Sequence, residues 1–302
     1  MQWLLITDNI IFFERFNITL LNLDKKNKCT LCDTDVEEIK KQKKNLTNLA
    51  ACIIYITDEK DLSPELNNIF SALSGFFAAN GIPLITNGEI LTQTNFLAKD
   101  NVIFTNNVDE ITSYISKKYK KLEESAKRRL AKKKLLDRGI PFTSDCFATY
   151  IAKNKIEVIN EFLEAGMSVN SRDDMGVPML NIACRNDNFE FVEMILNLGA
   201  DLNAVSDDRG YTAVMDAVWR GNEKITKYLI EKGADLNTIN KEGQSNLILA
   251  VGANRENIVK LLAENGSDPD VKDMMGMSAY TYATLFKKQR IVDILTPYHK
   301  QQ

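Results

Sequence analysis

Residues 199–203 of the chain read Gly199-Ala-Asp-Leu-Asn203, and the same five letters return as Gly233-Ala-Asp-Leu-Asn237. Glycines at 166 and 266 extend this series in both directions with a spacing of 33 or 34 residues. A second series with the same period consists of Gly176, Gly210, Gly243 and Gly276. Two independent series with one period indicate a structural unit that is repeated along the chain.

Each unit contains two short helical patterns. Residues 179–185 and 189–198 carry apolar side chains at intervals of three and four residues, which is the spacing of one helix face. Gly199, Gly233 and Gly266 follow the second pattern, where a left-handed residue ends a helix and glycine has no steric cost. The first helices share small residues at one position, namely Ala183, Ala217, Ala250 and Ala283. We therefore expect turn–helix–turn–helix units that stack closely and stabilise one another.

The runs Gly210-Tyr-Thr-Ala-Val-Met-Asp-Ala217 and Tyr228-Leu-Ile-Glu-Lys-Gly-Ala-Asp-Leu-Asn237 resemble the ankyrin repeat. The resemblance implies an all-α solenoid over residues 140–302, with about five repeats if the atypical ends, 140–170 and 271–302, are included. The family's threonine position holds Pro178, Thr212, Ser245 and Ser278, and its histidine position holds Asn181, Met215, Ile248 and Thr281. We therefore expect the family's histidine-centred hydrogen bonds to be absent.

The resemblance implies a binding scaffold that has no shared catalytic constellation. The family's contact positions lie on the hairpin tips and the concave face, and they fall on Met175, Arg185, Arg209, Tyr211, Trp219, Arg220 and Met274. Tyrosine, tryptophan and arginine often dominate protein interfaces, so we place the centre of a protein-binding site in the repeat that holds Trp219. The alternative is that Trp219 packs on a neighbouring helix.

The first part of the chain shows a different pattern. Short β-rich runs alternate with helical runs, and the expected strands are 3–7, 29–32, 51–57, 83–86 and 102–105. Five such units in a row predict an α/β domain over residues 1–116, with a flavodoxin-like parallel sheet that is covered on both faces.

Ligands of such domains lie beyond the carboxyl ends of the strands, where this sequence has Asp8, Asp58, Thr86 and Asn106. Their order resembles that of a response-regulator receiver domain, which implies Asp58 as a phosphoacceptor and Thr86 as the switch hydroxyl. The receiver's lysine position is Asn106, however, and only one acidic residue, Asp8, follows the first strand. Phosphoryl transfer is therefore poorly supported, and a small ligand at these residues is the other interpretation.

The run Gly75-Phe-Phe-Ala-Ala-Asn-Gly-Ile-Pro83 resembles a stretch of the TIR and nucleoside-deoxyribosyltransferase-like enzymes. The resemblance implies a nucleophilic glutamate two residues before the first glycine, where this chain has Leu73, and Glu65 lies further upstream. A degenerate, regulatory domain is the simpler interpretation. The alternative is an enzyme that acts on NAD or a nucleoside and is targeted by the repeats.

Cysteine and histidine do not form a convincing site. Cys29 and Cys32 have the spacing of metal ligands, but three residues along a strand place their side chains on opposite faces. His299 is the single histidine, and we expect it in a frayed tail. No metal, no cofactor and no catalytic residue is therefore predicted.

One segment is strongly basic although the chain carries a net charge of −3. Residues 117–138 contain eleven basic and three acidic side chains, a composition that could bind nucleic acid or acidic lipid. We interpret residues 117–139 as a solvated helical connector, in which Leu122, Ala126, Leu130 and Leu135 form the packed stripe. A nucleic-acid partner is accordingly not expected.

The five cysteines are odd in number and scattered, which favours free thiols in a reducing cytoplasm. The first residues lack a basic leader, and no uninterrupted apolar run reaches the roughly 18 residues of a membrane span. The sequence therefore predicts a cytoplasmic adaptor that binds a protein partner through its repeats.

Overall fold

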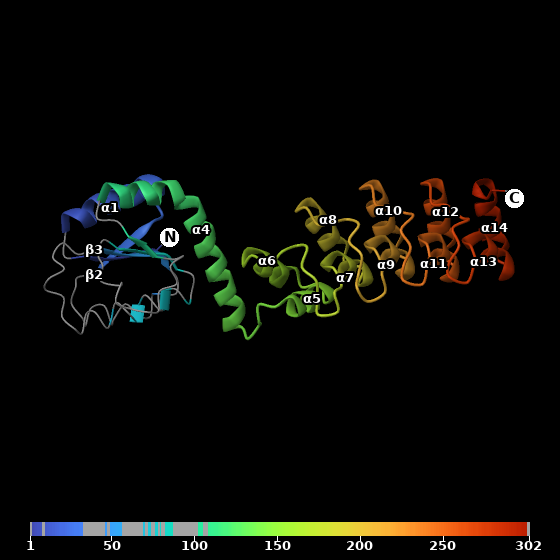
Figure 1. The fold of residues 1–302 in the computed structure, drawn as a ribbon, viewed down its shortest axis with the longest axis horizontal. Helices are drawn as coiled ribbons and strands as arrows, with labels where there is room; N and C mark the ends of the chain where they lie inside the picture. The colour runs from blue at the N-terminus through green and yellow to red at the C-terminus, as the bar shows by residue number, and fades with distance from the viewer. Residues whose placement is uncertain are drawn as a thin grey trace. The chain divides into compact units, whose positions relative to one another are not determined.

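The computed structural model describes residues 2–7, 10–32, 46, 49–55, 69, 72–73, 76–77, 79, 82–86, 102–104 and 108–300 (Figure 1). Its chain divides into two compact units, Met1–Lys134 and Leu135–Gln302. The first unit contains a parallel sheet, and the second consists of paired short helices.

The sheet of the first unit has five strands in the order β2-β1-β3-β4-β5, with every neighbouring pair parallel. The strands are β1 (Gln2–Thr7), β2 (Lys28–Cys32), β3 (Leu49–Tyr55), β4 (Leu84–Thr86) and β5 (Val102–Phe104). Each lies at a predicted β-rich run, so the expected parallel sheet is present.

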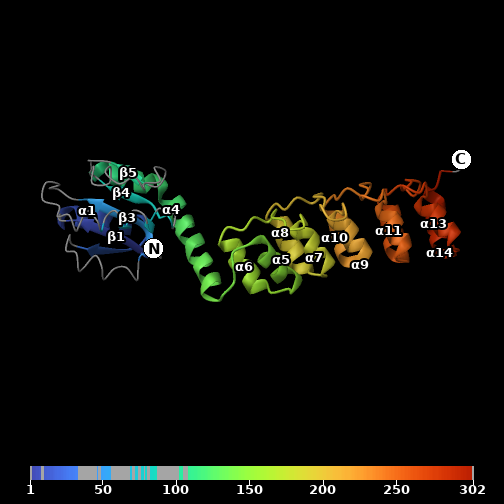
Figure 2. The ribbon, with the colours of Figure 1, turned by 60° about the horizontal axis from the view of Figure 1, so that its bottom comes forward.

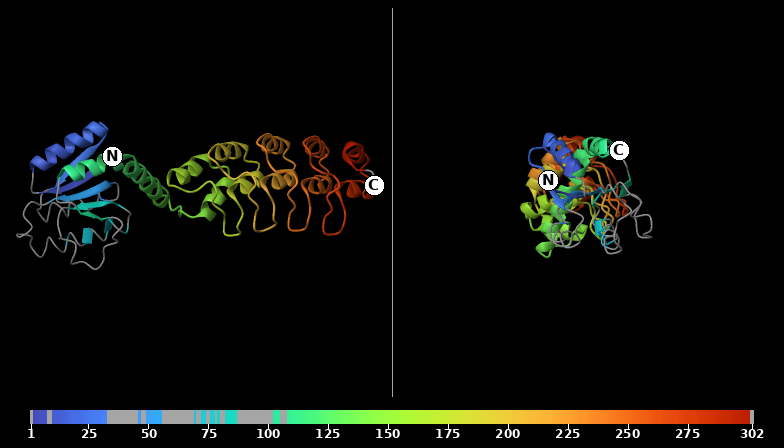
Figure 3. Two further views of the ribbon diagram at one scale, coloured as in Figure 1. Left: turned by 45° about the horizontal axis from the view of Figure 1, so that its top comes forward. Right: turned by 90° about the vertical axis from the view of Figure 1, so that its left-hand side faces the viewer.

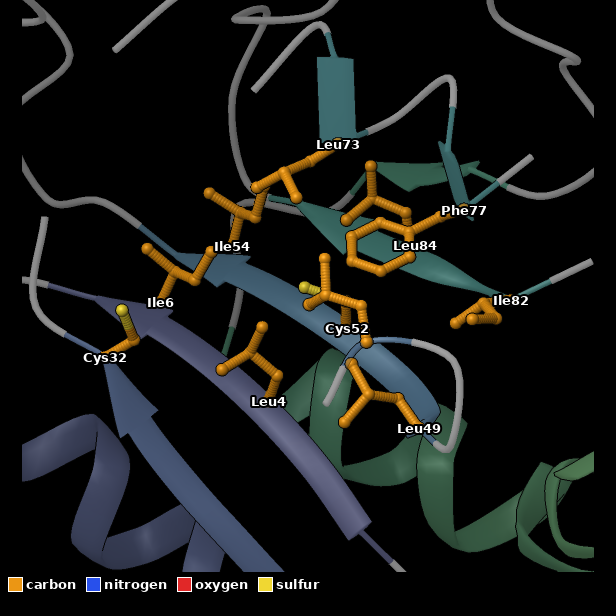
Figure 4. Packing of buried hydrophobic residues seen from close by; sticks show 11 residues of the cluster. Leu4, Ile6, Cys32, Leu49, Cys52, Ile54, Leu73, Phe77, Ile82 and Leu84 are labelled. Carbon is orange, nitrogen blue, oxygen red and sulfur yellow. The ribbon is translucent and has the colours of Figure 1, made fainter. Parts of the chain in front are cut away.

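Both faces of this sheet are buried, because successive residues of a strand point to opposite sides. Leu4 and Ile6 of β1 point to one face, where they share a core with Leu73 and Phe77 (Figure 4). Trp3 and Leu5 point to the other face and pack under the helices α1 (Ile10–Leu23) and α4 (Val108–Asp137). Burial on two faces explains why the strands read as continuous apolar runs.

A buried amide joins α4 to the turn between α1 and β2. Asn27 is 4% exposed, and its Oδ1 accepts hydrogen bonds from Trp3 Nε1 at 3.2 Å and from Tyr119 Oη at 3.1 Å. Its Nδ2 donates to the carbonyl of Leu20 at 2.8 Å. Both the oxygen and the nitrogen of this buried amide therefore have hydrogen-bond partners. These bonds hold the turn at one position along α4.

The basic segment is part of α4. Leu122 is buried and Ala126 packs against the same core, but Leu130 is 42% exposed. The predicted apolar stripe is therefore wrong at Leu130. Ala131 is buried instead, and at about 100° per residue it lies about 180° around the helix from Leu122, so the buried side of α4 changes along its length.

The second unit consists of five helix pairs stacked side by side (Figures 1 and 2). The pairs are α5 (Ser144–Ala152) with α6 (Ile156–Glu164), α7 (Met179–Arg185) with α8 (Phe189–Asn197), α9 (Ala213–Arg220) with α10 (Glu223–Glu231), α11 (Asn246–Gly252) with α12 (Glu256–Glu264), and α13 (Ala279–Leu285) with α14 (Gln289–Leu295). The last pair ends in a short 3-10 helix, Thr296–Tyr298.

Local sequence explains the boundaries of these helices. Gly199 and Gly233 each have a φ of +86°, the left-handed conformation predicted for a residue that ends a helix. The side chains of Thr212, Ser245 and Ser278 cap the helices that follow them. The alanine series at 183, 217, 250 and 283 is fully buried, as expected for small residues between stacked helices.

The tail prediction for His299 is wrong. Its ring stacks on Tyr280 with centroids 3.8 Å apart, and its Nδ1 lies 2.6 Å from Asp270 Oδ1. The sequence did not reveal this contact because its two partners lie 19 and 29 residues earlier in the chain. The contacts of His299 therefore hold the end of the last repeat in place, and this residue is not part of a frayed tail.

Candidate protein-binding face of the repeats

The loops that precede α7, α11 and α13 close as hairpins, through isolated antiparallel bridges such as Ile239 to Ser245. Figure 3 shows these loops projecting beside the row of helices α5, α7, α9, α11 and α13. We call the side formed by these hairpins and this row of helices the inner face. All seven contact residues that the sequence predicts belong to the loops before these helices or to the helices themselves.

An ionic network spans the hairpin and two inner helices. Arg185, at the end of α7, donates from Nε to Asp216 Oδ1 of α9 at 2.8 Å. Its Nη1 and Nη2 donate to the two carboxylate oxygens of Asp208 in the hairpin at 2.9 and 3.2 Å. Arg185 thus binds both carboxylates at once, which uses the planar geometry of the guanidinium group.

Asn181 completes the network from the position at which the family has histidine. Its Nδ2 donates to Asp216 Oδ2 and to the carbonyl of Tyr211, each at 2.9 Å. The chain lacks the histidine-centred bonds, but an asparagine makes bonds between repeats in their place. The replacement of histidine by asparagine could have been recognised in the sequence, because the asparagine side chain, like histidine, can donate hydrogen bonds.

The two carboxylates of the network have opposite pKa shifts. Burial raises the pKa of Asp216, and the charge and hydrogen bonds of Arg185 only partly offset that effect. Burial acts on Asp208 in the same direction, but hydrogen bonds from Arg185, from Ser206 and from the backbone of Arg209 hold its pKa well below the usual range. Asp208 is therefore the stably ionised partner of Arg185.

The structure places Tyr211 in the interior. Its side chain is 6% exposed, while Arg209 lies over its ring with the guanidinium carbon 5.0 Å from the centroid. The prediction that Tyr211 presents itself for contact is therefore corrected, because its ring packs into the repeat and supports Arg209. The arginine side chain itself is 48% exposed.

Trp219 stands on the inner face and is 47% exposed. Arg185 holds the equivalent position one repeat earlier and reaches a hairpin, so this position faces the hairpins. The following repeats have Gly252 and Leu285 there, and Leu285 is 60% exposed. A Cβ built on Gly252 would meet no heavy atom within 4 Å, so the space at this position of α11 is open.

Apolar exposure is greatest in the last repeat. Met175 is 63% exposed, Met274 is 77% exposed and Met275 is 79% exposed, all at hairpin tips. Phe286, at the end of α13, is 57% exposed, and Arg220, at the equivalent position two repeats earlier, is also exposed. Sequence reasoning missed Gly252, Leu285 and Phe286, although the repeat period aligns them with Arg185, Trp219 and Arg220 and could have identified them.

The candidate site of the α/β unit is only partly described. Thr86 is buried at the end of β4, whereas Asp8, Asp58 and Asn106 lie outside the described residues. Cys29 and Cys32 contact the cores on opposite faces of the sheet, as predicted. Burial raises the pKa of Cys29 to about 12. Among the residues that the structure describes, no three histidine, cysteine, aspartate or glutamate side chains gather in a way that could hold a metal.

None of the described helices is long and apolar enough to cross a bilayer. The five cysteines are unpaired.

Comparison with known families matches the second unit. The model for ankyrin repeats in three copies matches residues 146–240, and the single ankyrin-repeat model matches residues 242–274. An ankyrin repeat-containing protein of Treponema pallidum is 32% identical over 189 residues, which cover 63% of this chain and 63% of that protein. The chain thus spans less than two thirds of this relative.

Two further relatives match over shorter ranges. Protein phosphatase 1 regulatory subunit 27 of Mus musculus is 30% identical over 118 residues, which cover 38% of this chain and 76% of that protein. An ankyrin repeat protein of Borreliella burgdorferi is 30% identical over 95 residues, 28% of this chain and 42% of that protein. Through the repeats at residues 146–274, the chain belongs to the ankyrin-repeat family.

Proposed function

We propose that the chain is an adaptor that binds a protein partner on its inner face, with Trp219 at the centre of the site. Family membership supports the protein-binding role. The mouse relative is by its name a regulatory subunit of another protein, a phosphatase. The single observation that carries the proposal is the half-exposed Trp219, with open space at Gly252, the equivalent position of the next repeat.

The chemistry around this position suggests what the partner presents. Trp219 and Leu285 border the position of Gly252 on successive inner helices, so an apolar side chain of the partner fits between them. Arg209 and Arg220 are exposed in the same repeat as Trp219, and they can donate to carboxylate or carbonyl groups of the partner. Arg185 is already engaged by two carboxylates, so we assign it a role in shaping the face.

Two opposite substitutions test this site. Trp219→Ala removes the anchor, and Gly252→Leu fills the open space. The backbone of Gly252 lies at the end of α11 outside the left-handed region, so leucine is compatible with its helix. The control is Leu198→Ala, which removes an exposed apolar side chain, 57% exposed, at the end of the outer helix α8.

The measurement is affinity capture from an extract of the source organism with each chain immobilised. A polypeptide captured by the wild type and by Leu198→Ala, but by neither Trp219→Ala nor Gly252→Leu, is the expected result. Equal capture by all four chains would refute the placement of the site on the inner face.

For the first unit we infer a flavodoxin-like, non-catalytic domain with a regulatory role. The strand order of the parallel sheet supports the fold, since that order occurs in doubly wound α/β proteins. The TIR and nucleoside-deoxyribosyltransferase-like enzymes have a nucleophilic glutamate where this chain has Leu73. Leu73 is buried in the core, which supports a domain that does not catalyse their reaction. A small ligand of this domain would contact Asp8, Asp58, Thr86 and Asn106.

Incubation with NAD tests the non-catalytic assignment. We expect no release of nicotinamide by the full-length chain, and a release that Glu65→Gln abolishes would establish the enzyme instead. The unpaired cysteines support a cytoplasmic location for the adaptor.

A further inference from the structure

The helix layer of the α/β unit has an outer face that combines basic and apolar side chains. The chain as a whole has a net charge of −3, yet residues 117–138 hold eleven basic and three acidic side chains. The rest of the chain is therefore acidic, with 27 basic and 38 acidic residues. The positive charge is concentrated on one part of one helix.

Helix α4 turns this charge away from the sheet. Ile115, Tyr119 and Leu122 are buried against the core, so residues half a turn away from them face outward. These outward residues are Lys117, Lys120, Lys121, Glu124, Lys127 and Arg128, and all of them are exposed. Only Glu124 and the ion pair of Lys127 with Glu123, at 2.9 Å, interrupt the basic row.

Helix α1 lies on the same side of the sheet and contributes apolar side chains. Phe16 and Leu20 are buried in the core that α1 shares with α4. Ile18 is 59% exposed and Leu21 is 41% exposed, and the helix period points both away from the sheet. Two aliphatic side chains therefore stand on the same outer side as the basic row.

The turn after α1 adds two more lysines, Lys25 and Lys26. Lys26 lies 91 residues before Lys117, the first residue of the basic row. Lys25 and Lys26 are exposed in this turn, and Asn27 ties the turn to α4 through the hydroxyl of Tyr119. The charges of Asp24 in the turn and of Lys127 in the helix both act on that hydroxyl. The turn and the basic row are thus held together by a buried hydrogen bond.

We propose that this surface docks the chain on an anionic lipid bilayer. We call it the outer helix face and define it by Ile18, Leu21, Lys25, Lys26, Lys117, Lys120, Lys121 and Arg128. Clustered lysines are attracted to anionic headgroups, and exposed aliphatic side chains enter the headgroup region beside them. A nucleic acid would use the lysines but would leave Ile18 and Leu21 without a role, so the aliphatic pair favours the bilayer.

The docking is peripheral and reversible. The charge attraction is of the order of one kcal/mol for each lysine near the surface, which corresponds to about fivefold in partitioning. It weakens with salt because surface charges are screened over about 10 Å at 0.1 M ionic strength. The repeats play no part in this contact, so the surface adds a second binding function to the chain.

The test is co-sedimentation of the full-length chain with vesicles of phosphatidylcholine and phosphatidylserine in a 7:3 ratio and with vesicles of phosphatidylcholine alone. The helix variant carries Lys117→Gln, Lys120→Gln and Lys121→Gln, and the turn variant carries Lys25→Gln and Lys26→Gln. A third variant carries Ile18→Ser and Leu21→Ser. The matched control carries Lys227→Gln, Lys260→Gln and Lys272→Gln, which remove three exposed lysines of the repeats.

We expect the wild type and the control to sediment with the anionic vesicles and not with the neutral ones. The helix variant should lose on the order of a hundredfold in partitioning, the turn variant roughly twentyfold, and the aliphatic variant about tenfold. Circular dichroism melting of each variant shows whether the α/β unit is folded. Where the aliphatic variant does not fold, the two lysine variants decide the question.

Three results would overturn the proposal. One is the absence of sedimentation with anionic vesicles at 50 mM salt. Another is an equal loss in the helix variant and in the control, which would mean that net charge and not this surface is responsible. The third is lysine-dependent binding to double-stranded RNA or DNA without binding to vesicles, which would reassign the surface to nucleic acid.

Discussion

Arg185 and Asp216 are joined by a hydrogen-bonded ion pair of 2.8 Å that connects two successive repeats. Asp216 is 1% exposed, so its carboxylate depends on this arginine and on Asn181 for compensation. A buried carboxylate without its partner is costly. The pair therefore makes the stability of one repeat depend on the next.

Arg185→Met tests that dependence. The substitution keeps the length of the side chain but leaves Asp216 buried without a cation, and we expect the free energy of unfolding to fall by about 3 kcal/mol. Urea denaturation followed by circular dichroism measures the change. The double variant Arg185→Met with Asp216→Asn should recover part of the loss, and the exposed Arg220→Met should stay within about 0.5 kcal/mol of the wild type. A loss of the same size in Arg220→Met would contradict the role of the pair.

Asp208 should make the repeats sensitive to acid. Its pKa in the folded state is depressed by hydrogen bonds from Arg185, from Ser206 and from the backbone, against the effect of burial. A depressed pKa stabilises the folded state above the unfolded-state pKa of about 3.9, and this stabilisation is lost as the pH falls. Asp208→Asn should therefore lower the melting temperature at pH 7, and the gap to the wild type should narrow from about pH 4 downward. A gap that is constant between pH 7 and pH 3 would argue against the ionised pair.

Burial distinguishes the two aromatic residues that the sequence placed together at the binding site. Tyr211 is 6% exposed and Trp219 is 47% exposed. Tyr211→Ala should cost about 3 kcal/mol or more because it leaves a cavity, whereas Trp219→Ala should cost less than about 1 kcal/mol. Differential scanning calorimetry on both variants measures this difference. If Trp219→Ala were the more destabilising change, the tryptophan would be a core residue and the proposed site would move.

Asn27 should stabilise the α/β unit. Asn27→Ala leaves the indole N–H of Trp3 and the hydroxyl of Tyr119 buried without an acceptor, at a cost of about 1–3 kcal/mol for each group. The chain has two tryptophans, so a Trp219→Phe background leaves Trp3 as the single fluorescent reporter of this unit. We expect the fluorescence-detected urea midpoint to fall in Asn27→Ala, with the exposed Asn22→Ala as the control. Equal midpoints in the two variants would mean that the amide does not hold the turn.

Sequence and structure agree best where a local rule acts. The glycines at 199 and 233 are left-handed, and Thr212 and Ser245 cap their helices, because each conformation depends on a few neighbouring atoms. They disagree on whether particular side chains are buried or exposed. Tyr211 and Leu130 were misplaced, since the repeat pattern and the helix period do not state which neighbours surround a given side chain.

The candidate site shows the same division. The repeat period identified Trp219 as a contact residue, but the open space at Gly252 depends on what stands around it in the folded array. The partners of Arg185 and Asn181 were not predictable from their spacing either. Each lies 23 to 35 residues away in the chain.

The ankyrin architecture of the second unit and the parallel sheet of the first were predictable from the amino-acid sequence, because periodic glycines, small alanines and apolar β-rich runs act through short-range sterics and burial. Which distant polar groups meet depends instead on the folded arrangement of the chain. Asn27 joins Tyr119 across 92 residues, and Arg185 joins Asp216 across 31. Such pairs require stacking to bring the groups within hydrogen-bond distance, and no local pattern encodes that distance.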